Sequence, residues 1–286
     1  MLGYAWQKGL IPVSHEAIEQ AIRLNKVAVE ANLDAFAWGR VMADDPARLP
    51  QPTAPRRSLD EMTTEELIAH RKAHLTAYQN RRLADRYTAL VGRVEQATSK
   101  LADKALADKI VRSVAHSYAR VLAPKDEYEV ARLLTAPEFR KGLEDSFEGD
   151  MKLSLNLAPP FLSKPGPTGR PAKREFGPWL FPVLRTLARL KSLRGTALDP
   201  FGHTAERRAE RALIPDYEAD VAKVRAILDD RTATKALALL DLYNQIRGFG
   251  PVKDAAMAQA FERRTKLLAE LDRGAEPPRG HAMAAE

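Results

Sequence analysis

The sequence has no cysteine among its 286 residues. This absence excludes disulfide bonds, and it removes the thiolate ligands that an iron-sulfur cluster or a cysteine-type zinc site requires. We therefore expect a protein of a reducing compartment, the cytoplasm.

Long apolar runs are also lacking. No stretch approaches the ~20 consecutive apolar residues of a membrane-spanning helix. The residues after Met1 do not show the basic and then apolar layout of a signal peptide. We expect no association with a membrane.

The composition is that of an ordinary globular protein, with 45% hydrophobic and 29% charged residues. The length allows one large domain or two modest ones. A formal net charge of +7 favours weak attraction to polyanions, but both signs are interspersed along the chain, as on a solvated surface.

Apolar residues recur at helical spacing along most of the chain, which predicts a mainly α fold. Gly92 is the weakest point of a long helical pattern, and Pro215 predicts a break or kink in a later one. Asp126 and Glu127 suit the first turn of a helix, where carboxylates meet the positive end of its dipole. The other expected helices span residues 14–39, 63–94, 99–123, 137–143, 178–194, 206–228, 235–247 and 251–271.

One stretch breaks the helical period. From Met151 to Leu157 apolar and polar residues alternate, which is typical of a half-buried strand. A basic segment rich in proline and glycine follows at residues 164–174. We therefore expect a small strand and loop element near residues 150–176 within the α-helical chain.

Proline-rich segments divide the chain. Residues 44–60 contain four prolines and almost no large apolar residue, so we interpret them as a linker. The predicted units are a helical segment at 1–43, this linker, a multi-helix domain at 61–273 and a flexible tail at 274–286.

The search for catalytic chemistry yields little. His70 and His74 have the i, i+4 spacing of a metal-binding pair, but surface histidines are the favoured interpretation and we predict no metal site. Glu148 and Asp150 suit a polar site, although a turn around Gly149 uses the same residues and is favoured. No phosphate-binding loop or nucleophile elbow is present, and no catalytic residue is predicted.

The basic stretch is the better candidate for binding. Guanidinium and ammonium groups there suit an anionic ligand or an acidic partner. Neighbouring aromatics such as Phe176 and Trp179 suit nucleic-acid stacking, but core packing is their commoner use, so nucleic acid is not expected. The candidate anion-binding residues are Arg170, Lys173, Arg174, Arg185 and Arg189.

Several short strings resemble a known family. Residues 3–12 (GYAWQKGLIP), 16–25 and 35–40 are similar to the closing segment of the gamma-type domain of 2-oxoacid:ferredoxin oxidoreductases. The remainder, to about Leu271, resembles the helical extension that follows this domain in fused indolepyruvate ferredoxin oxidoreductases. The strings that carry this second resemblance are residues 125–133 (KDEYEVARL), 147–152 (FEGDMK), 157–160 (LAPP), 169–171 (GRP), 176–179 (FGPW), 198–202 (LDPFG), 204–211 (TAERRAER) and 246–253 (IRGFGPVK).

The resemblance implies a mainly α C-terminal domain preceded by a helical remnant of an α/β gamma-type domain. It also implies an intact enzyme that decarboxylates an aryl 2-oxoacid, uses thiamine diphosphate and 4Fe-4S clusters, and needs CoA and ferredoxin as partners. The thiamine-binding motif and the cysteine-rich cluster module of the family are absent, so we expect no cofactor on this chain. Lys26 departs from the family pattern, in which we expect glycine, and Ala31 is a second departure.

Three hypotheses follow. The chain is a non-catalytic helical portion or subunit of the oxidoreductase, in a homo-oligomer with the remaining domains or subunits, and supports assembly or closes the substrate and CoA side. Alternatively it is an anion-binding module that uses Lys173 and Arg174 for the CoA phosphates, or a stand-alone helical nucleic-acid binder. Copurification, CoA protection from heat and salt-dependent retention distinguish these hypotheses.

Overall fold

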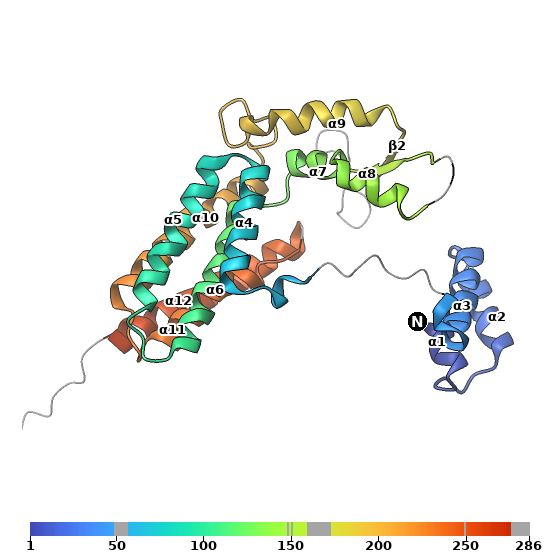
Figure 1. The fold of residues 1–286 in the computed structure, drawn as a ribbon, viewed down its shortest axis with the longest axis horizontal. Coiled ribbons are helices and arrows are strands. Elements are labelled where there is room, and N and C mark those ends of the chain that lie inside the picture. Colours follow the sequence, from blue (N-terminus) through green and yellow to red (C-terminus); the bar gives the residue numbers. More distant parts are fainter. Residues whose placement is uncertain (49–56, 148, 150, 159–172, 249, 276–286) are drawn as a thin grey trace, which may run out of the picture. The chain divides into compact units, whose positions relative to one another are not determined.

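The computed structural model describes residues 1–48, 57–147, 149, 151–158, 173–248 and 250–275. It divides the chain into two compact units, Met1–Ser58 and Leu59–Glu286 (Figure 1). Both units are helical, and the described residues contain one sheet, of two strands. The predicted mainly α fold is therefore confirmed. No described helix is long and apolar enough to cross a bilayer.

Parts of the predicted domain division lie outside the described residues. This applies to residues 49–56 of the predicted linker and to residues 276–286 of the predicted tail. The assignment of the first unit to a gamma-type domain stays a prediction.

The first unit contains three helices: α1 (Leu2–Gln7), α2 (His15–Asn25) and α3 (Val29–Asp44), followed by the short 3-10 helix η1 (Pro46–Arg48). The expectation of one helix over residues 14–39 is wrong at two points. The helix is interrupted because Lys26 and Ala28 adopt φ values of 54° and 43°, in the left-handed region. The second of the two resulting helices, α3, continues beyond Gly39 to Asp44.

Gly39 serves helix packing rather than helix termination. A Cβ on Gly39 would lie 3.0 Å from the backbone nitrogen of Tyr4, and one on Gly3 would lie 1.9 Å from the carbonyl oxygen of Phe36. The two glycines therefore allow α1 and α3 to approach closely. The side chain of Phe36 is buried at this crossing, beside the ring of Trp6.

The second unit is built on a helical bundle (Figure 1). A single apolar core, formed by side chains that recur on one face of each helix, joins its members. The bundle elements are η2 (Leu59–Glu61), α4 (Thr64–Tyr78), α5 (Arg81–Thr98), α6 (Lys104–Leu122), α10 (Ala205–Ile227), α11 (Ala233–Asp241), η4 (Leu242–Gln245) and α12 (Pro251–Ala275).

Two expectations about the bundle helices are wrong. The long helix expected over residues 63–94 is two helices, because Asn80 is extended and its side chain accepts the N–H of Leu83, which starts α5. Gly92 lies inside α5 and does not interrupt it. Conversely, α10 continues through Pro215 without a break, although a kink there stays a prediction. Its buried residues Leu213 and Tyr217 hold the turns on both sides against the same core.

Tyrosines run through the core of the bundle. The rings of Tyr87 and Tyr118 stack 6.1 Å apart, Tyr118 stacks on Tyr217 at 5.6 Å, and Tyr217 meets Tyr243 edge-on at 4.7 Å. Each hydroxyl finds an acceptor, as when Tyr243 donates to Asp220 at 2.8 Å. The core can bury these polar groups because they are paired.

A smaller layer connects α6 to α10. It contains α7 (Glu127–Leu134), α8 (Pro137–Glu144), β1 (Leu155–Leu157), β2 (Arg174–Phe176), α9 (Leu180–Arg189) and the 3-10 helix η3 (Leu190–Leu193). The strands are antiparallel, with Leu155 opposite Phe176. The strand expected from Met151 is therefore present only over its last three residues. These strands and α9 enclose a second apolar cluster with α7.

The left-handed conformation of Lys26 generates a prediction. Glycine at this C-cap adopts that conformation without the steric cost of a Cβ, so Lys26→Gly should stabilise the first unit by roughly 0.5 to 1 kcal/mol. Urea unfolding followed by fluorescence would measure this in a Trp179→Phe background, where Trp6 and Trp38 of the first unit are the remaining tryptophans.

The matched control is Gln20→Gly, at an exposed position inside α2. It should destabilise the same unit by about 1 kcal/mol, because glycine there costs backbone entropy with no strain to relieve. A loss of stability in both variants would contradict strain at Lys26.

Candidate functional site

The predicted anion-binding residues lie on two elements. Lys173 precedes β2 and Arg174 begins it, whereas Arg185 and Arg189 lie on α9, and all four side chains are exposed. Arg170 lies outside the described residues. Among the described residues no hydrogen bond or ion pair is recorded for these four side chains. An anion site there stays a prediction.

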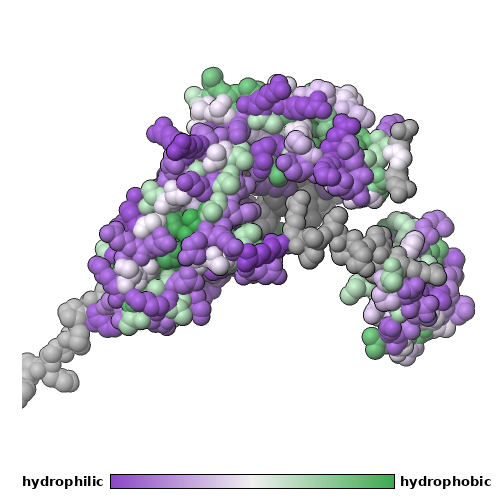
Figure 2. Space-filling view, viewed as in Figure 1, coloured by the Kyte–Doolittle hydropathy of each residue, from purple (hydrophilic) through white to green (hydrophobic). Residues whose placement is uncertain are grey.

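Arg185 also lines a groove of about 600 Å³ between α8 and α9. Most of the lining is apolar, including Phe139, Leu143 and Phe181, and the side chain of Arg140 at the rim is paired with Glu144. Figure 2 shows apolar surface among hydrophilic residues where α9 lies, at the top of the view.

The most highly organised polar site lies elsewhere, where α4 ends and α7 begins. Asp126 is the N-cap of α7, and its Oδ1 accepts the N–H of Glu129 at 2.8 Å. Its Oδ2 accepts the hydroxyl of Tyr78, the last residue of α4, at 3.0 Å. Although Asp126 is only 6% exposed, both of its oxygens are thus bound. Capping was the expected role, and the contact with Tyr78 is additional.

Arg194 neutralises Asp126. Its Nη2 lies 2.9 Å from Oδ1 of Asp126, and its Nε bonds to Oδ2, so the pair is bidentate. The Nη1 of Arg194 donates to the carbonyl oxygen of Tyr78 at 2.6 Å, and its guanidinium lies 3.6 Å from the centre of the Tyr78 ring. This one side chain therefore ties the segment after η3 to α4 and α7.

Asp199 organises the adjoining turn. Its carboxylate accepts the hydroxyl of Tyr128 at 3.1 Å and the backbone N–H groups of Gly195 at 2.8 Å and Phe201 at 3.1 Å. Burial alone would raise the pKa of Asp199, but these donors outweigh burial and lower it. A Cβ on Gly202 would lie 2.6 Å from the Asp199 carboxylate, so the turn requires glycine there.

Arg207 connects the start of α10 to the start of α7. It bonds to the carbonyl oxygen of Lys125 at 2.9 Å, to Glu127 at 3.3 Å and to Glu210 at 2.6 Å. Glu210 is also paired with Lys253 of α12. Burial acts to lower the pKa of Arg207, but Glu127 and Glu210 outweigh burial and raise it.

These groups, apart from Lys253, line a cleft of about 230 Å³. We call them the ion-pair cluster: Tyr78, Asp126, Glu127, Tyr128, Arg194, Asp199, Arg207, Glu210 and Lys253. Burial, followed by Asp199, raises the pKa of Tyr128 to about 12, so its hydroxyl stays protonated at neutral pH. Each carboxylate of the cluster accepts protein donors. The arrangement is suited to joining segments rather than to proton transfer.

A second buried carboxylate lies beside this cluster. Glu129 binds Arg132 through both oxygens, at 2.7 and 2.8 Å, and its Oε1 lies 3.4 Å from Nε2 of His74. Burial acts to raise the pKa of Glu129, but Arg132 and His74 together lower it to about 2. His74, which the sequence places in a possible metal pair with His70, thus contacts a carboxylate instead. No group of three metal-ligating side chains occurs within the described part of the chain.

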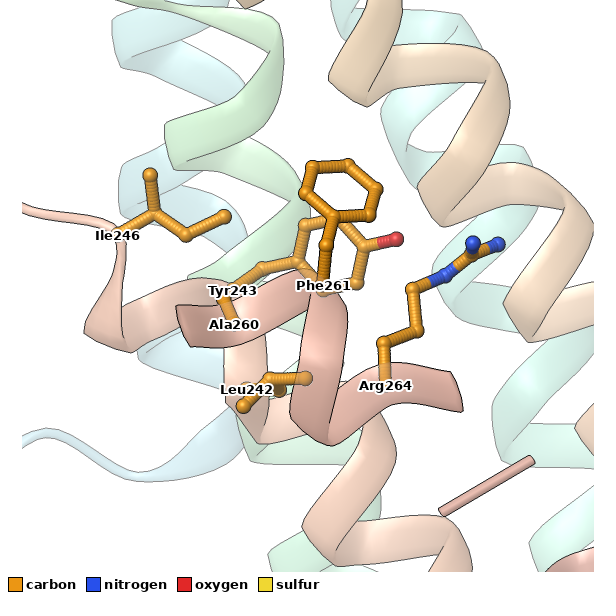
Figure 3. Close-up of a pocket in the computed structure, with 6 residues that line it drawn as sticks. All are labelled: Leu242, Tyr243, Ile246, Ala260, Phe261 and Arg264. Carbon is orange, nitrogen blue, oxygen red and sulfur yellow. The ribbon is translucent and has the colours of Figure 1, made fainter. Parts of the chain in front are cut away.

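A third cavity lies between η4 and α12 (Figure 3). It measures about 10 Å³, so at most one water fits. In Figure 3 the Tyr243 hydroxyl and the Arg264 guanidinium point to the same side, where both bind Asp220. This gap is a packing feature of an internal ion pair and offers no room for a metabolite.

Sequence reasoning missed the ion-pair cluster, although all of its members except Tyr78 and Arg194 lie in strings that the resemblance singles out. Asp126 and Arg194 are separated by 68 positions, and no periodic pattern connects residues so far apart. The available signal was compositional: strings 125–133, 198–202, 204–211 and 246–253 each carry charged residues beside a helix start or a glycine.

Comparison with known proteins returns one family. A model described as a family of unknown function, DUF6537, matches residues 64–266. No curated protein and no solved structure matches the chain. The matched range contains the whole ion-pair cluster.

The Asp126–Arg194 pair generates a stability prediction. Asp126→Ala leaves a guanidinium buried without its carboxylate, which should cost about 3 to 5 kcal/mol. The matched control is Asp145→Ala, which removes one partner of the exposed pair with Lys141 and should cost less than about 1 kcal/mol. Denaturant unfolding of both variants measures the difference, and equal losses would contradict a role for the buried pair.

The lowered pKa of Glu129 generates a pH prediction. A carboxylate with a depressed pKa stabilises the fold fully above its ordinary value of 4.5, and this contribution is lost as the pH falls towards about 2. The stability difference between wild type and Glu129→Gln should therefore shrink over that window, by on the order of 3 kcal/mol.

Unfolding free energies at several pH values would test this. Glu262→Gln, at an exposed carboxylate paired with Lys266, should show a much smaller change over the same window. A difference between wild type and Glu129→Gln that stays constant with pH would contradict the depressed pKa.

Proposed function

The chain belongs to the DUF6537 family, and we propose that it is a non-catalytic, C-terminal helical portion or subunit of an indolepyruvate (aryl 2-oxoacid):ferredoxin oxidoreductase. In this proposal it supports assembly of the complex and closes its substrate and CoA side, while other domains or subunits perform the chemistry.

One observation carries the proposal: four strings that resemble the oxidoreductase extension converge on the ion-pair cluster. Asp126 comes from the first string, Asp199 from the second, Arg207 from the third and Lys253 from the fourth. Residues spread over much of the second unit thus form one buried network. This favours a resemblance of the whole folded domain over chance similarity of separate strings.

The chemistry of the network supports a structural role. General acid–base catalysis works best with a pKa near the operating pH and a group within reach of substrate. Here the pKa of Glu129, beside the cluster, is about 2 and the pKa of Tyr128 is about 12, and both side chains are buried. Such groups keep one protonation state at neutral pH, as expected of a scaffold.

The residues present do not fit the iron-sulfur clusters that the resemblance implies. Iron-sulfur clusters take cysteine thiolates, and the sequence has none. The proposal therefore assigns thiamine diphosphate and the 4Fe-4S clusters to the remaining domains or subunits.

The first unit supports a role in assembly. Among its described residues the buried apolar side chains are few, Ile18, Phe36 and Ala43, whereas several large apolar side chains are exposed. Among these, Trp38 of α3 is 60% exposed. A contiguous partner would bury such groups, and apolar side chains that lie open in a small unit are typical of interfaces.

Recovery of the tagged chain from its native cells tests the proposal. Polypeptides that carry thiamine diphosphate, iron and acid-labile sulfide should co-elute, and the eluate should reduce a viologen dye when indolepyruvate and CoA are added. A chain that elutes alone, as a monomer without these cofactors, would overturn the proposal.

A matched pair of variants tests attachment through the first unit. Trp38→Glu should reduce the co-eluting cofactors by at least tenfold, because a charge in an apolar interface is desolvated without a partner. Trp179→Glu, at a residue of the second unit with 64% exposure, should leave them unchanged. Equal loss from both variants would contradict attachment through α3.

A further inference from the structure

Two arginines converge on one backbone carbonyl at the end of η4. Nη1 of Arg120, from α6, and Nε of Arg247, after η4, both donate to the carbonyl oxygen of Asn244, at 3.4 and 2.8 Å. Their guanidinium groups are therefore close neighbours. Like charges in such proximity repel each other unless an anion lies between them.

Asn244 is held in place on its other side. Its Oδ1 lies 2.9 Å from Nδ1 of His116, one turn before Arg120 on α6, and its Nδ2 donates to Asp241 at 2.8 Å. The carbonyl that positions both guanidinium groups thus belongs to a fixed residue. The two arginines are pre-organised rather than free to separate.

A third arginine lies nearby. Arg71, on α4, has its Nε buried without a hydrogen-bond partner in the described chain. Its charge acts on Arg120: burial, Arg247 and Arg71, in that order, lower the pKa of Arg120. Burial is the largest cause that lowers the pKa of His116, and the charges of Arg71, Arg120 and Arg247 lower it further. The hydrogen bond to Asn244 acts in the opposite direction. Arg120, Arg247 and His116 thus meet at Asn244, and Arg71 acts on Arg120 and His116 through its charge.

The arginines of this group differ from those of the ion-pair cluster in their partners. In the cluster, Arg194 and Arg207 each meet a carboxylate. Across the described residues no ion pair is recorded for Arg71, Arg120 or Arg247. None of the three arginines is thus in contact with a carboxylate, the nearby Asp241 being bound to Asn244, and the Nε of Arg71 is removed from water.

Capping of η4 explains only part of this arrangement. Basic side chains commonly bind the last carbonyls of a helix, and one arginine would satisfy Asn244. A second donor to the same oxygen adds repulsion, and Arg71 does not bind that carbonyl. A binding site for an anion accounts for all three arginines.

The backbone after Arg247 keeps it in place. Gly248 has a φ of 104°, which favours glycine, and a Cβ there would lie 2.8 Å from the side chain of Val252. The chain therefore turns sharply at this point into α12. Arg247 itself is exposed, so its guanidinium group is accessible from solvent.

We propose that Arg71, Arg120 and Arg247 form a binding site for the phosphoryl group of a small molecule. Guanidinium groups bind phosphoryl oxygens through paired N–H donors, and three of them match a dianion with three oxygens better than a carboxylate with two. Binding would supply a counter-charge for this group of arginines. This site is distinct from the basic residues of β2 and α9.

Thermal unfolding and calorimetry on the full chain test the proposal. Inorganic phosphate and pyrophosphate should raise the melting temperature of the wild type, because a ligand that binds only the folded state stabilises it. Sodium chloride at matched ionic strength and succinate should not. Glycerol phosphate is measured in parallel to distinguish a phosphate ester from free phosphate as the ligand. The one that binds more tightly is the kind of ligand that the site takes.

Three variants make the test specific. Arg120→Gln and Arg247→Gln should each weaken phosphate binding at least tenfold, and Arg120→Gln should melt at a higher temperature than wild type without phosphate, because repulsion is relieved. Arg82→Gln removes the same charge from an exposed position on α5 and should bind phosphate like wild type.

The proposal is overturned if Arg120→Gln and Arg247→Gln keep the wild-type affinity, if Arg82→Gln loses it to the same extent, or if succinate binds as tightly as phosphate. Should Arg120→Gln fail to fold, Arg247→Gln alone decides, since its side chain is exposed. Neither result depends on copurification, so this proposal and the proposed function fail independently.

Discussion

The buried pairing of Asp126 with Arg194 is the interaction on which the arrangement of the second unit depends. It joins three places where regular structure stops: the last residue of α4, the N-cap of α7 and the segment after η3. The rings of Tyr78 and Tyr128 are buried beside this pair, so charge pairing and packing act together at these segments. Because the desolvation of each ion is costly, the geometry is tolerable only if both partners stay in place. The turn at Asp199 and the docking of Arg207 on α7 extend the same network.

The distribution of arginines separates architecture from recognition. Where an arginine forms an ion pair with a carboxylate of its own chain, its charge stabilises the fold. The ion-pair cluster and the Arg264–Asp220 pair of the bundle core are examples. Where arginines gather without a carboxylate, the fold retains unfavourable charge. Natural proteins commonly accept such local instability at sites that bind ligands. The scaffold role proposed for the family and the phosphoryl site proposed near Asn244 therefore concern different parts of one unit and are compatible.

Much of the fold can be predicted from the sequence, because the local spacing of apolar residues indicates where helices form. The stripes on α6, α10 and α12 are visible in the spacing of apolar residues, and Pro137 marks the start of α8. The break before α5 was missed because the apolar stripe continues across it, although Asn80 is a favourable N-cap residue. The expectation of glycine at position 26 came from the family resemblance, and the left-handed backbone of Lys26 gives it a physical reason. Neither the ion-pair cluster nor the arginine group could be found in this way, because their members come together only through the tertiary fold.

The two-stranded sheet has a consequence for self-association. In a pair of strands each one leaves a backbone edge unpaired, and such edges can recruit strands from other molecules. Here each strand is three residues long, which offers an incoming chain too few hydrogen-bonding groups for a stable addition. The cationic side chains of Lys173 and Arg174 at the start of β2 further disfavour stacking of like edges. The element that interrupts the helical chain is thereby protected from seeding fibrils.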